Sequence, residues 1–504
     1  MSSSPPTSPS PSQSQPQATA LKDSPSPLAV LPLPTILRTL LSTTVSSSPW
    51  LLPPSLKIMS AMAHSDAALL NPDRNPLLRH LLKKTFYAQF CAGENAAEVR
   101  RTVLGLKAIG FHGVIMGYAR EVVLTQAQQD ALAAGGGASS SAEVEAECVR
   151  HEVEPWKQGN LETLRVAQPG PGGDFVALKF TGAGRQALYA LKNRLPPPPA
   201  LAAAIDEICA LARAKDVPLL FDAEQDAVQP AIDDWTMHYQ RKYNRNNTQE
   251  GQGPGQGRAL IYGTYQAYLK STPATLASHL AAASREGFTL GVKLVRGAYL
   301  GSDPRHIIHD TKEDTDAAYD AVASSLIRRR WGPVLRCPPQ DAGATFPPVS
   351  VVLGSHNLAS VRKAQALRAS PEAAPGTELA IAQLMGMADD VSCDLLAANR
   401  ACVAQAQAQQ QKSSSEKTKD AAAAAAAGSS SSSSSTRVGA AAAAAPAITK
   451  AYKYIVWGST KECMAYLLRR AHENKDAVSR TRSARDAMWG ELKRRVKGVF
   501  GVAA

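Results

Sequence analysis

Eight short apolar runs, each followed by a segment of helical character, constrain the fold of this chain more than any other feature of its sequence. Most of the runs are continuous rather than alternating in polarity, which is the pattern of strands buried on both faces of a sheet. Strands that alternate with helices indicate a parallel sheet, and eight is the number of strands that closes a (βα)8 barrel of the TIM type. A doubly wound open sheet is the structural alternative. The runs span residues 113–119, 175–181, 218–224, 259–265, 291–297, 349–355, 378–385 and 452–458.

Four segments between these runs have the features of helices. Apolar residues recur at close to helical spacing over 201–215. Segment 273–287 has a proline near its start and ends on a glycine, which is typical of helix termini. Segments 314–330 and 356–370 have the same character, so we expect helices over all four.

Low-complexity stretches interrupt this pattern. Residues 1–29 are rich in Ser, Pro and Gln, and residues 404–447 contain Gln, Ala and Ser tracts, so neither has the periodic apolar face that a packed core requires. We expect a disordered tail and presequence over 1–64 and one barrel domain over 65–504. The long insert should be a surface excursion, because lengthening a loop costs little free energy. The expected inserts in the barrel lie at 131–143, 244–258, 335–348 and 404–447.

The charge and the cysteines restrict the function classes. The formal charge is +12, but the basic residues are spread thinly and no DNA-binding motif spacing accompanies them, so we expect no nucleic-acid partner. A solvated surface explains the charge best, with weak membrane association as the alternative. Seven scattered cysteines, without a metal-ligand spacing, favour a reducing compartment and predict no metal site.

The amino-terminal apolar stretch predicts no membrane-spanning helix. Prolines break residues 27–63 well before the ~18 uninterrupted apolar residues that a span requires. Asp23 is the only carboxylate before Asp66. This acid-poor composition suits a mitochondrial presequence, and a disordered tail explains it equally well.

Polar side chains fall at the carboxyl ends of the runs, where parallel α/β folds bind ligands. Lys179 and Asp222 end consecutive runs and are expected to form an ion pair at the barrel mouth, because an unpaired charge in an apolar strand is costly. A purely structural pair is the alternative. His356 could equally be a hydrogen-bonded core histidine. Other polar or small residues at these ends are Glu224, Gln266, Lys293, Arg296, Gly297, Ala298, Tyr299, Ser355, Asn357 and Gln383, and the eighth run begins with Tyr452 and Tyr454.

The helix after the eighth run carries two adjacent arginines in "YLLRRAHENK". Tyr466, Arg469, Arg470 and Glu473 share one helical face, because residues three and four apart are neighbours. On an ordinary outer helix of a barrel this face would meet solvent. If the helix leans over the barrel mouth, two guanidinium groups could bind one carboxylate through paired, charge-assisted hydrogen bonds.

Motifs of several common enzyme classes are absent. The sequence has no G-x-S-x-G elbow, no H-E-x-x-H pair and no phosphate-binding G-x-x-x-x-G-K loop. The "GQGPGQG" stretch at 251–257 mimics a dinucleotide-binding fingerprint, but no strand leads into it and it contains a proline.

Several long segments resemble the eukaryotic, particularly fungal, proline dehydrogenases. They include "VALKFTGAGR", "FDAEQDAVQPAI", "YGTYQAYLKST", "KLVRGAYL", "QLMGMADDVS" and "YKYIVWGSTKECMAYLLRRAHEN", and they run in order from about residue 69 to residue 480. The resemblance implies a distorted (βα)8 barrel that holds FAD at the carboxyl ends of its strands. It further implies oxidation of L-proline to Δ1-pyrroline-5-carboxylate, the first step of proline catabolism to glutamate. The electrons would pass to a ubiquinone-type acceptor at the matrix side of the mitochondrial inner membrane, which the protein would contact peripherally.

The resemblance also implies roles for individual residues. Arg469 and Arg470 would bind the proline carboxylate, and Glu473 would orient them. Lys179 and Asp222 would be the catalytic residues lining the pocket, and Leu294, Tyr454 and Tyr466 would contact the substrate. The flavin contacts would be Gln266, Lys293, Val295, Gly297, Ala298, Tyr299, Thr311, Lys312, Ser355 and His356.

Two other functions remain open. A flavin enzyme of the same fold could oxidise hydroxyproline or another cyclic imino acid, because one side chain against the ring changes specificity by only a few kcal/mol. A non-catalytic basic scaffold could also retain the fold.

Overall fold

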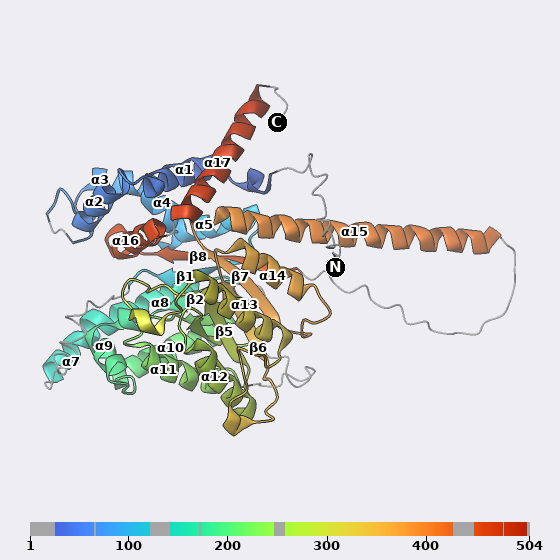
Figure 1. Cartoon of the computed structure of the whole chain (residues 1–504). Helices are drawn as coiled ribbons and strands as arrows, with labels where there is room; N and C mark the ends of the chain where they lie inside the picture. Colours follow the sequence, from blue (N-terminus) through green and yellow to red (C-terminus); the bar gives the residue numbers. More distant parts are fainter. Residues whose placement is uncertain are drawn as a thin grey trace, which may run out of the picture.

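A closed barrel of eight parallel strands forms the centre of the molecule (Figure 1). The structure is a computed structural model that describes residues 26–64, 67–120, 142–170, 173–245, 258–426, 448–476 and 478–500. The strands pair in sequence order, and β1 pairs with β8 to close the circle, so the predicted barrel is confirmed. The strands are β1 (Gly113–Tyr118), β2 (Phe175–Leu178), β3 (Leu219–Phe221), β4 (Ile261–Gln266), β5 (Leu290–Val295), β6 (Val349–Gly354), β7 (Glu378–Leu384) and β8 (Lys450–Trp457).

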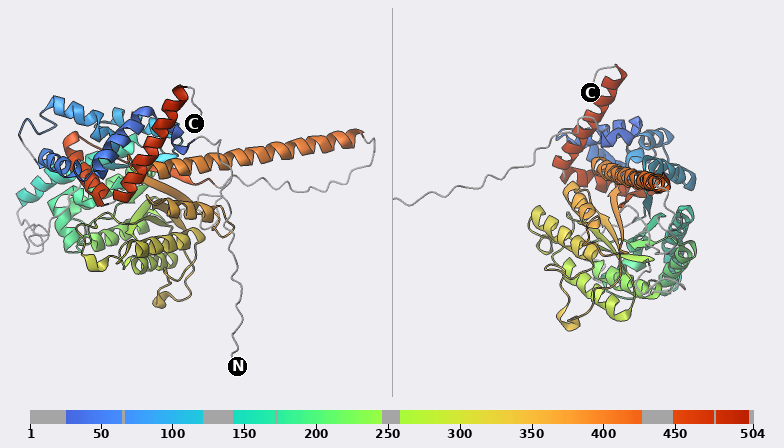
Figure 2. Two further views of the ribbon diagram at one scale, coloured as in Figure 1. Left: turned by 45° about the horizontal axis from the view of Figure 1, so that its top comes forward. Right: turned by 90° about the vertical axis from the view of Figure 1, so that its right-hand side faces the viewer.

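Helices cover the outside of the barrel, and further helices lie at one side of it (Figures 1 and 2). All four helices expected from the sequence are present, as α10, α12, α13 and α14. The α-helices are α1 (Leu33–Ser47), α2 (Leu52–His64), α3 (Pro76–Lys84), α4 (Phe86–Phe90), α5 (Ala96–Ile109), α7 (Ala142–Cys148), α8 (Glu154–Val166), α9 (Arg185–Lys192), α10 (Pro199–Lys215), α11 (Gln229–Tyr243), α12 (Thr272–Glu286), α13 (Lys312–Arg328), α14 (Leu358–Arg368), α15 (Asp389–Ala426), α16 (Thr460–Asp476) and α17 (Val478–Val499). Short helical turns are η1 (Pro27–Val30), η2 (Val149–Val153), η3 (Phe180–Ala183), η4 (Arg305–Ile307) and η5 (Pro339–Asp341).

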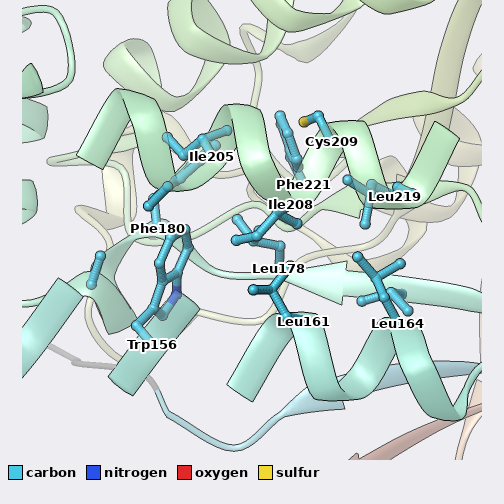
Figure 3. Packing of buried hydrophobic residues seen from close by; sticks show 14 of the residues in the cluster. Trp156, Leu161, Leu164, Leu178, Phe180, Ile205, Ile208, Cys209, Leu219 and Phe221 are labelled. Carbon is cyan, nitrogen blue, oxygen red and sulfur yellow. The ribbon is translucent and has the colours of Figure 1, made fainter. Parts of the chain in front are cut away.

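Apolar side chains lie on both faces of the strands, which explains the continuous apolar runs. On the outer face, Trp156 and Leu161 of α8 pack with Leu178 of β2 and Ile208 of α10 (Figure 3). On the inner face, side chains from several strands fill the barrel as a packed core. This inner cluster contains Ile115, Phe175, Ala177, Leu220, Ala259, Tyr262, Val352, Ala380, Ala382 and Tyr452.

Residues 26–64 differ from the disordered tail that their composition predicts. They form η1, α1 and α2. Pro27, Pro34, Pro53 and Pro54 lie in the first turns of these helices, where the missing N–H has no helical partner, while Pro32 is the N-cap of α1 and Pro49 lies between α1 and α2. Leu28 and Ile36 pack with Met488 of α17 and Cys393 of α15. These helices therefore belong to the folded body. Residues 1–25 of the predicted tail lie outside the described residues.

The insert between β7 and β8 begins as helix rather than as an irregular loop. The 38 residues of α15 continue through the Gln-rich part of the insert, and the helix extends away from the barrel (Figure 1). The remainder of the insert, residues 427–447, lies outside the described residues. The described part of the insert thus adds no second core.

Candidate active site

A cavity of about 590 Å³ opens at the carboxyl ends of the barrel strands. Its size falls in the range of small-molecule and cofactor sites. A larger hollow of about 920 Å³ lies between η1, α5 and α15, but its lining contains only one charged residue, Arg400. The residues predicted for the site that line the 590 Å³ cavity are Lys179, Asp222, Gln266, Lys293, Val295, Gly297, Ala298, Tyr299, Ser355, His356, Tyr454, Tyr466 and Arg469.

Asp222 is the centre of a polar cluster in this cavity. Its carboxylate forms ion pairs with Lys293 and, over 3.4 Å, with Lys179, and it accepts a hydrogen bond of 2.7 Å from the Tyr454 hydroxyl. Burial alone would raise the pKa of Asp222, but the two ammonium groups and the hydrogen bonds from Lys293 and Tyr454 lower it to about 2. The expected pair of Lys179 and Asp222 is therefore present within a larger cluster, and Asp222 stays ionised at neutral pH.

The backbone around this cluster fixes its side chains. Trp156 Nε1 donates a hydrogen bond of 2.9 Å to the carbonyl oxygen of Lys179. A Cβ atom at Gly117 on β1 would lie 2.9 Å from the Tyr454 hydroxyl, so this glycine leaves the space that the tyrosine occupies. Lys293 Nζ also lies 5.2 Å from the centre of the Tyr454 ring, a cation–π arrangement. The ring of Tyr454 is thus held as a wall of the cavity.

The loop after β5 is held over the cavity by a close contact with Tyr268. Gly297 has a φ of +151°, and a Cβ atom there would lie 2.4 Å from the Tyr268 ring. The Tyr268 hydroxyl donates a hydrogen bond of 2.6 Å to Asp303, at the other end of the same loop. In addition, Ala298 N donates to Gln266 Oε1 over 3.1 Å. These contacts position the backbone of the loop and Tyr299 beside the cavity.

Helix α16 brings Tyr466 and Arg469 into the lining of the cavity, so the helix leans over the barrel mouth as the functional hypothesis requires. Tyr466 is buried, and the Arg469 guanidinium carbon lies 5.6 Å from the centre of the Tyr299 ring. The side chains of Arg470 and Glu473 lie outside the described residues.

The start of α16 is fixed by Glu94. This carboxylate accepts hydrogen bonds from Thr460 N and Thr460 Oγ1, at 3.0 and 2.6 Å, and forms ion pairs with Arg79 and Lys83. Although burial opposes ionisation, these partners lower the pKa of Glu94 to about 2. An anion is stabilising at the amino end of a helix, so Glu94 helps to set the position of α16 over the mouth.

Comparison with known proteins decides the family. The family model described as proline dehydrogenase matches residues 99–483. The chain belongs to the proline dehydrogenase family. The probable mitochondrial proline dehydrogenase of Schizosaccharomyces pombe is 27% identical over 505 residues, covering 92% of this chain and 88% of that protein. The hydroxyproline dehydrogenase of Bos taurus is 27% identical over 464 residues, covering 83% of this chain and 82% of that protein.

The fold is also found in a solved structure of proline utilization A (PutA) from Bdellovibrio bacteriovorus, inactivated by N-propargylglycine. The TM-score is 0.54 at 13% identity, covering 87% of this chain. The chain spans only 38% of the length of that protein, and at this identity the likeness shows the fold alone.

Three residues predicted for the site of this family member do not line the cavity. Leu294 is fully buried in the apolar cluster outside the barrel, because side chains alternate along β5 and its neighbours Lys293 and Val295 point inward. The prediction that Leu294 packs on the substrate ring is therefore wrong. Thr311 caps the start of α13, and Lys312, whose side chain is 70% exposed, pairs with Asp316. Neither of these last two reaches the cavity.

Of the residues that line the cavity without a role assigned from the sequence, Arg296 and Leu384 bear most on the site. Arg296 donates hydrogen bonds of 2.6 Å to Ser355 and 2.8 Å to Ser360, and its ion pair with Asp316 connects the cavity to the start of α13. Leu384, at the end of β7, is the other. Alternation along β7 places Leu384 on the same face as the inward Ala380 and Ala382, and this signal could have found it.

His356 has both a structural contact and a place in the lining. Its Nε2 atom accepts a hydrogen bond of 3.1 Å from Leu384 N, which ties the end of β6 to the end of β7. It therefore meets the expectation of a hydrogen-bonded histidine while still lining the cavity.

The cavity fits a flavin in size and in chemistry. Thr264 Oγ1 is buried in its lining and has no hydrogen-bond partner among the described residues, so a bound group could satisfy it. Lys179, Lys293 and Arg296 supply positive charge, and apolar side chains such as Val295 and Leu384 line other parts of the cavity. No helix in the described part of the chain is long and apolar enough to span a membrane.

Proposed function

We propose that this chain oxidises L-proline to Δ1-pyrroline-5-carboxylate, with FAD as cofactor and a ubiquinone-type electron acceptor. The observation that carries the proposal is the presence, in one cavity, of Arg469 and Tyr466 from α16 and the Asp222 cluster from the strand ends. Bound FAD would accept a hydride from the ring carbon next to the substrate nitrogen.

The protein would bind and orient the substrate. Arg469 and Arg470 would bind its carboxylate, a task suited to guanidinium groups because they form paired, charge-assisted hydrogen bonds. Glu473, one helical turn further on, would orient the arginines. The ring of Tyr454, held by Asp222, would limit the positions of the substrate ring, and such orientation lowers the entropic part of the barrier.

The cofactor contacts would come from the carboxyl ends of β4, β5 and β6 and from the loop after β5. We include Arg296 among the proposed cofactor contacts because, like Lys293, it is cationic and lines the cavity. The full proposed set is Gln266, Lys293, Val295, Arg296, Gly297, Ala298, Tyr299, Ser355 and His356.

Hydroxyproline is the second candidate substrate, because relatives named hydroxyproline dehydrogenase cover most of this chain. The aromatic wall at Tyr454 favours an unsubstituted ring, since a hydroxyl group needs additional space and a hydrogen-bond partner. We further propose a mitochondrial location, with peripheral contact at the matrix side of the inner membrane. The acid-poor amino terminus and the names of the relatives support this location.

The flavin spectrum of the purified protein tests the proposal. We expect a yellow protein whose absorbance bleaches on anaerobic addition of L-proline, and less readily with hydroxyproline. Arg469→Met and Arg470→Met should each stay yellow but lose saturation by proline. A colourless protein would overturn the proposed cofactor, and unchanged proline affinity in both variants would remove α16 from the site.

A further inference from the structure

A second, smaller pocket lies beside the active-site cavity, between α11, α12 and the carboxyl end of β4. Its volume is about 240 Å³. Thr264 and Gln266 line both this pocket and the 590 Å³ cavity, so the end of β4 forms the wall between the two. We call the smaller one the side pocket, and its polar lining includes Arg194, Asp226, Asp233, Asp234, Ser271 and His279.

The side pocket reaches from the protein surface to this wall. Arg194, Asp234 and Ser271 are exposed at its outer side, whereas Thr264 and Gln266 are buried at its inner side. Arg194 and Asp234 form an exposed ion pair of 2.7 Å at the opening. A water molecule occupies ~30 Å³ in the liquid, so the pocket has room for several, and its lining offers them hydrogen-bond partners. The side pocket therefore provides a hydrated route between solvent and the wall of the active site.

The Thr264 hydroxyl group lies in this wall without a hydrogen-bond partner among the described residues. The amide of its neighbour Gln266 is occupied, because Nε2 donates to Glu224 O over 3.2 Å and Oε1 accepts from Ala298 N over 3.1 Å. Thr264 also pairs in register with Lys293, a member of the polar cluster in the active site. A hydroxyl group can donate and accept at the same time, so Thr264 can pass a proton from one side of the wall to the other.

Asp233 supplies a proton acceptor in the side pocket. Its carboxylate is partly buried on α11 and accepts a hydrogen bond of 2.8 Å from Gln229. Burial, reinforced by the charge of Asp234, raises the pKa of Asp233 to about 7, although Gln229 and Arg194 act in the opposite direction. A group with a pKa near the working pH can both take up a proton and release it again.

The other titratable groups that face Asp233 are less suited to this task. Burial lowers the pKa of His279, on α12, to about 4, and its Nδ1 atom shares a hydrogen bond of 2.8 Å with the Tyr265 hydroxyl. Burial raises the pKa of Tyr265 well above its ordinary value, so this hydroxyl stays protonated. Asp226 precedes α11, and its backbone N–H donates to Asp303 over 3.0 Å. The pKa of Asp233 is therefore the one that matches proton transfer at neutral pH.

We propose that the side pocket carries the proton released by the substrate amine out of the active site, through the Thr264 hydroxyl group and pocket water to the Asp233 carboxylate. The inference rests on the proposed oxidation of a cyclic amino acid, because that reaction releases this proton. An alkyl amine has a pKa of about 10, so the substrate nitrogen is an ammonium ion at neutral pH. One N–H bond breaks, and its electron pair stays on nitrogen to complete the C=N bond when the hydride leaves the ring carbon. The proton forms the carboxylic acid of Asp233 and then passes to solvent at the opening of the pocket.

Anaerobic bleaching of the flavin by L-proline, followed between about pH 6 and pH 10 and compared per bound flavin, tests the proposal. Thr264→Val keeps the shape of the side chain and removes the hydroxyl group. It should slow bleaching at pH 7 by about 100-fold, the lower end of what positioned proton transfer contributes. Near pH 10 much of the amine has already lost its proton in solution, so the slowing should shrink to about twofold or less.

Two further variants separate proton transfer from a structural effect. Thr264→Ser keeps a hydroxyl group and should restore most of the rate at pH 7. Asp233→Asn should slow bleaching at pH 7 as Thr264→Val does. Asp320→Asn is its matched control, because Asp320 has a side chain only 20% exposed but borders neither pocket, and it should bleach like the unchanged protein.

An infrared titration without substrate gives a readout that needs no turnover. The unchanged protein should show a carboxylic-acid C=O absorption that disappears as the pH rises through about 7 and that is missing from Asp233→Asn. A carboxyl group of Asp233 that kept one protonation state from pH 5 to pH 9 could not take up and release the proton, and this result would overturn the inference.

The pH profile decides between the remaining outcomes. An unchanged rate of Thr264→Val at pH 7 would overturn the inference, and so would equal slowing at pH 7 and pH 10, because a structural defect does not depend on the protonation of the amine. If L-proline did not bleach the unchanged protein at any pH, the proposed function itself would fail, and the inference would fail with it.

Discussion

The Tyr454 hydroxyl donates a hydrogen bond of 2.7 Å to Asp222, and this bond joins the last strand of the barrel to the carboxyl end of the third. The other oxygen of the same carboxylate is paired with Lys293 from the fifth strand. One buried anion thus connects side chains from across the barrel mouth. The shape of the cavity therefore depends on the negative charge of Asp222 as well as on the size of the Asp222 side chain.

Asp222→Asn should therefore be far more disruptive than its small change in shape suggests. It removes the negative charge that pairs with the buried Lys293 and the half-buried Lys179, and breaking a buried ion pair in this way costs about 3–5 kcal/mol. Urea unfolding should report this loss, and flavin absorbance should report reduced cofactor content.

Tyr454→Phe is the matched control, because it keeps the ring and both ion pairs and removes only one hydrogen bond. We expect Tyr454→Phe to lower the free energy of unfolding by about 1–2 kcal/mol. If Asp222→Asn were no less stable than Tyr454→Phe, the buried charge would not hold the cluster together.

Asp233 on α11 predicts an unusual dependence of stability on pH. Burial, reinforced by the neighbouring Asp234, raises the pKa of Asp233 to about 7 although Gln229 donates a hydrogen bond to it. Between the ordinary carboxyl pKa of about 4 and this value, the folded state binds more protons than the unfolded state. Stability should therefore fall as the pH rises through this window and then level off.

Asp233→Asn should remove this fall, because the amide is neutral and its oxygen can still accept the hydrogen bond from Gln229. At pH 8 we expect the variant to be more stable by about 2 kcal/mol, and its melting temperature should change little between pH 5 and pH 8. Asp234→Asn is the control, since this neighbour is 55% exposed in its ion pair with Arg194. An equal flattening of the pH profile by both substitutions would contradict the role of burial.

The fold could be predicted from the sequence because the strands of this barrel are buried on both faces. That burial makes each strand a continuous apolar run, and the order of the runs gave the topology that the structure confirms. The pairing of Lys179 with Asp222 was also predictable, since neighbouring parallel strands end side by side. The contact between Asp222 and Lys293 could not be predicted from the sequence, because it crosses the barrel mouth between β3 and β5, which are not adjacent.

The errors have equally specific causes. Leu294 was placed in the site by resemblance, although alternation from Lys293 along the strand places its side chain outward. The helices of residues 26–64 were missed because a tail with six prolines resembles disorder, while in the structure most of these prolines start helices. The burial of Thr39 and Thr43 on α1 could not be inferred at all, since a sequence pattern does not say which polar residues of a helix meet the protein.

The outer part of α15 should be dispensable for folding. Asn399 donates a hydrogen bond of 2.7 Å to the carbonyl oxygen of Thr449, so the chain leaves the barrel and returns to it at the same place. Replacing residues 411–444 with about eight Gly and Ser residues leaves the part of α15 that borders the hollow intact. Such a linker spans on the order of 15 Å, enough to return from residue 410. We expect the free energy of unfolding of the shortened protein to stay within about 0.5 kcal/mol of that of the unchanged protein, measured by urea unfolding. A larger loss would show that the outer part of the helix contributes to the folded body.

Gly297→Ala should disturb the cavity from a position that carries no polar side chain. At a φ of +151°, the added methyl group would lie 2.4 Å from the Tyr268 ring, so the loop or the ring must move. Either movement weakens the hydrogen bonds from Tyr268 to Asp303 and from Ala298 to Gln266. We expect a destabilisation of about 1–3 kcal/mol and reduced flavin content in the purified protein, measured by absorbance.

Gly301→Ala is the control in the same loop, because its Cβ would meet open space and its φ is not positive. If both variants retained full flavin content, the contact between Gly297 and Tyr268 would not be what holds the loop over the cavity.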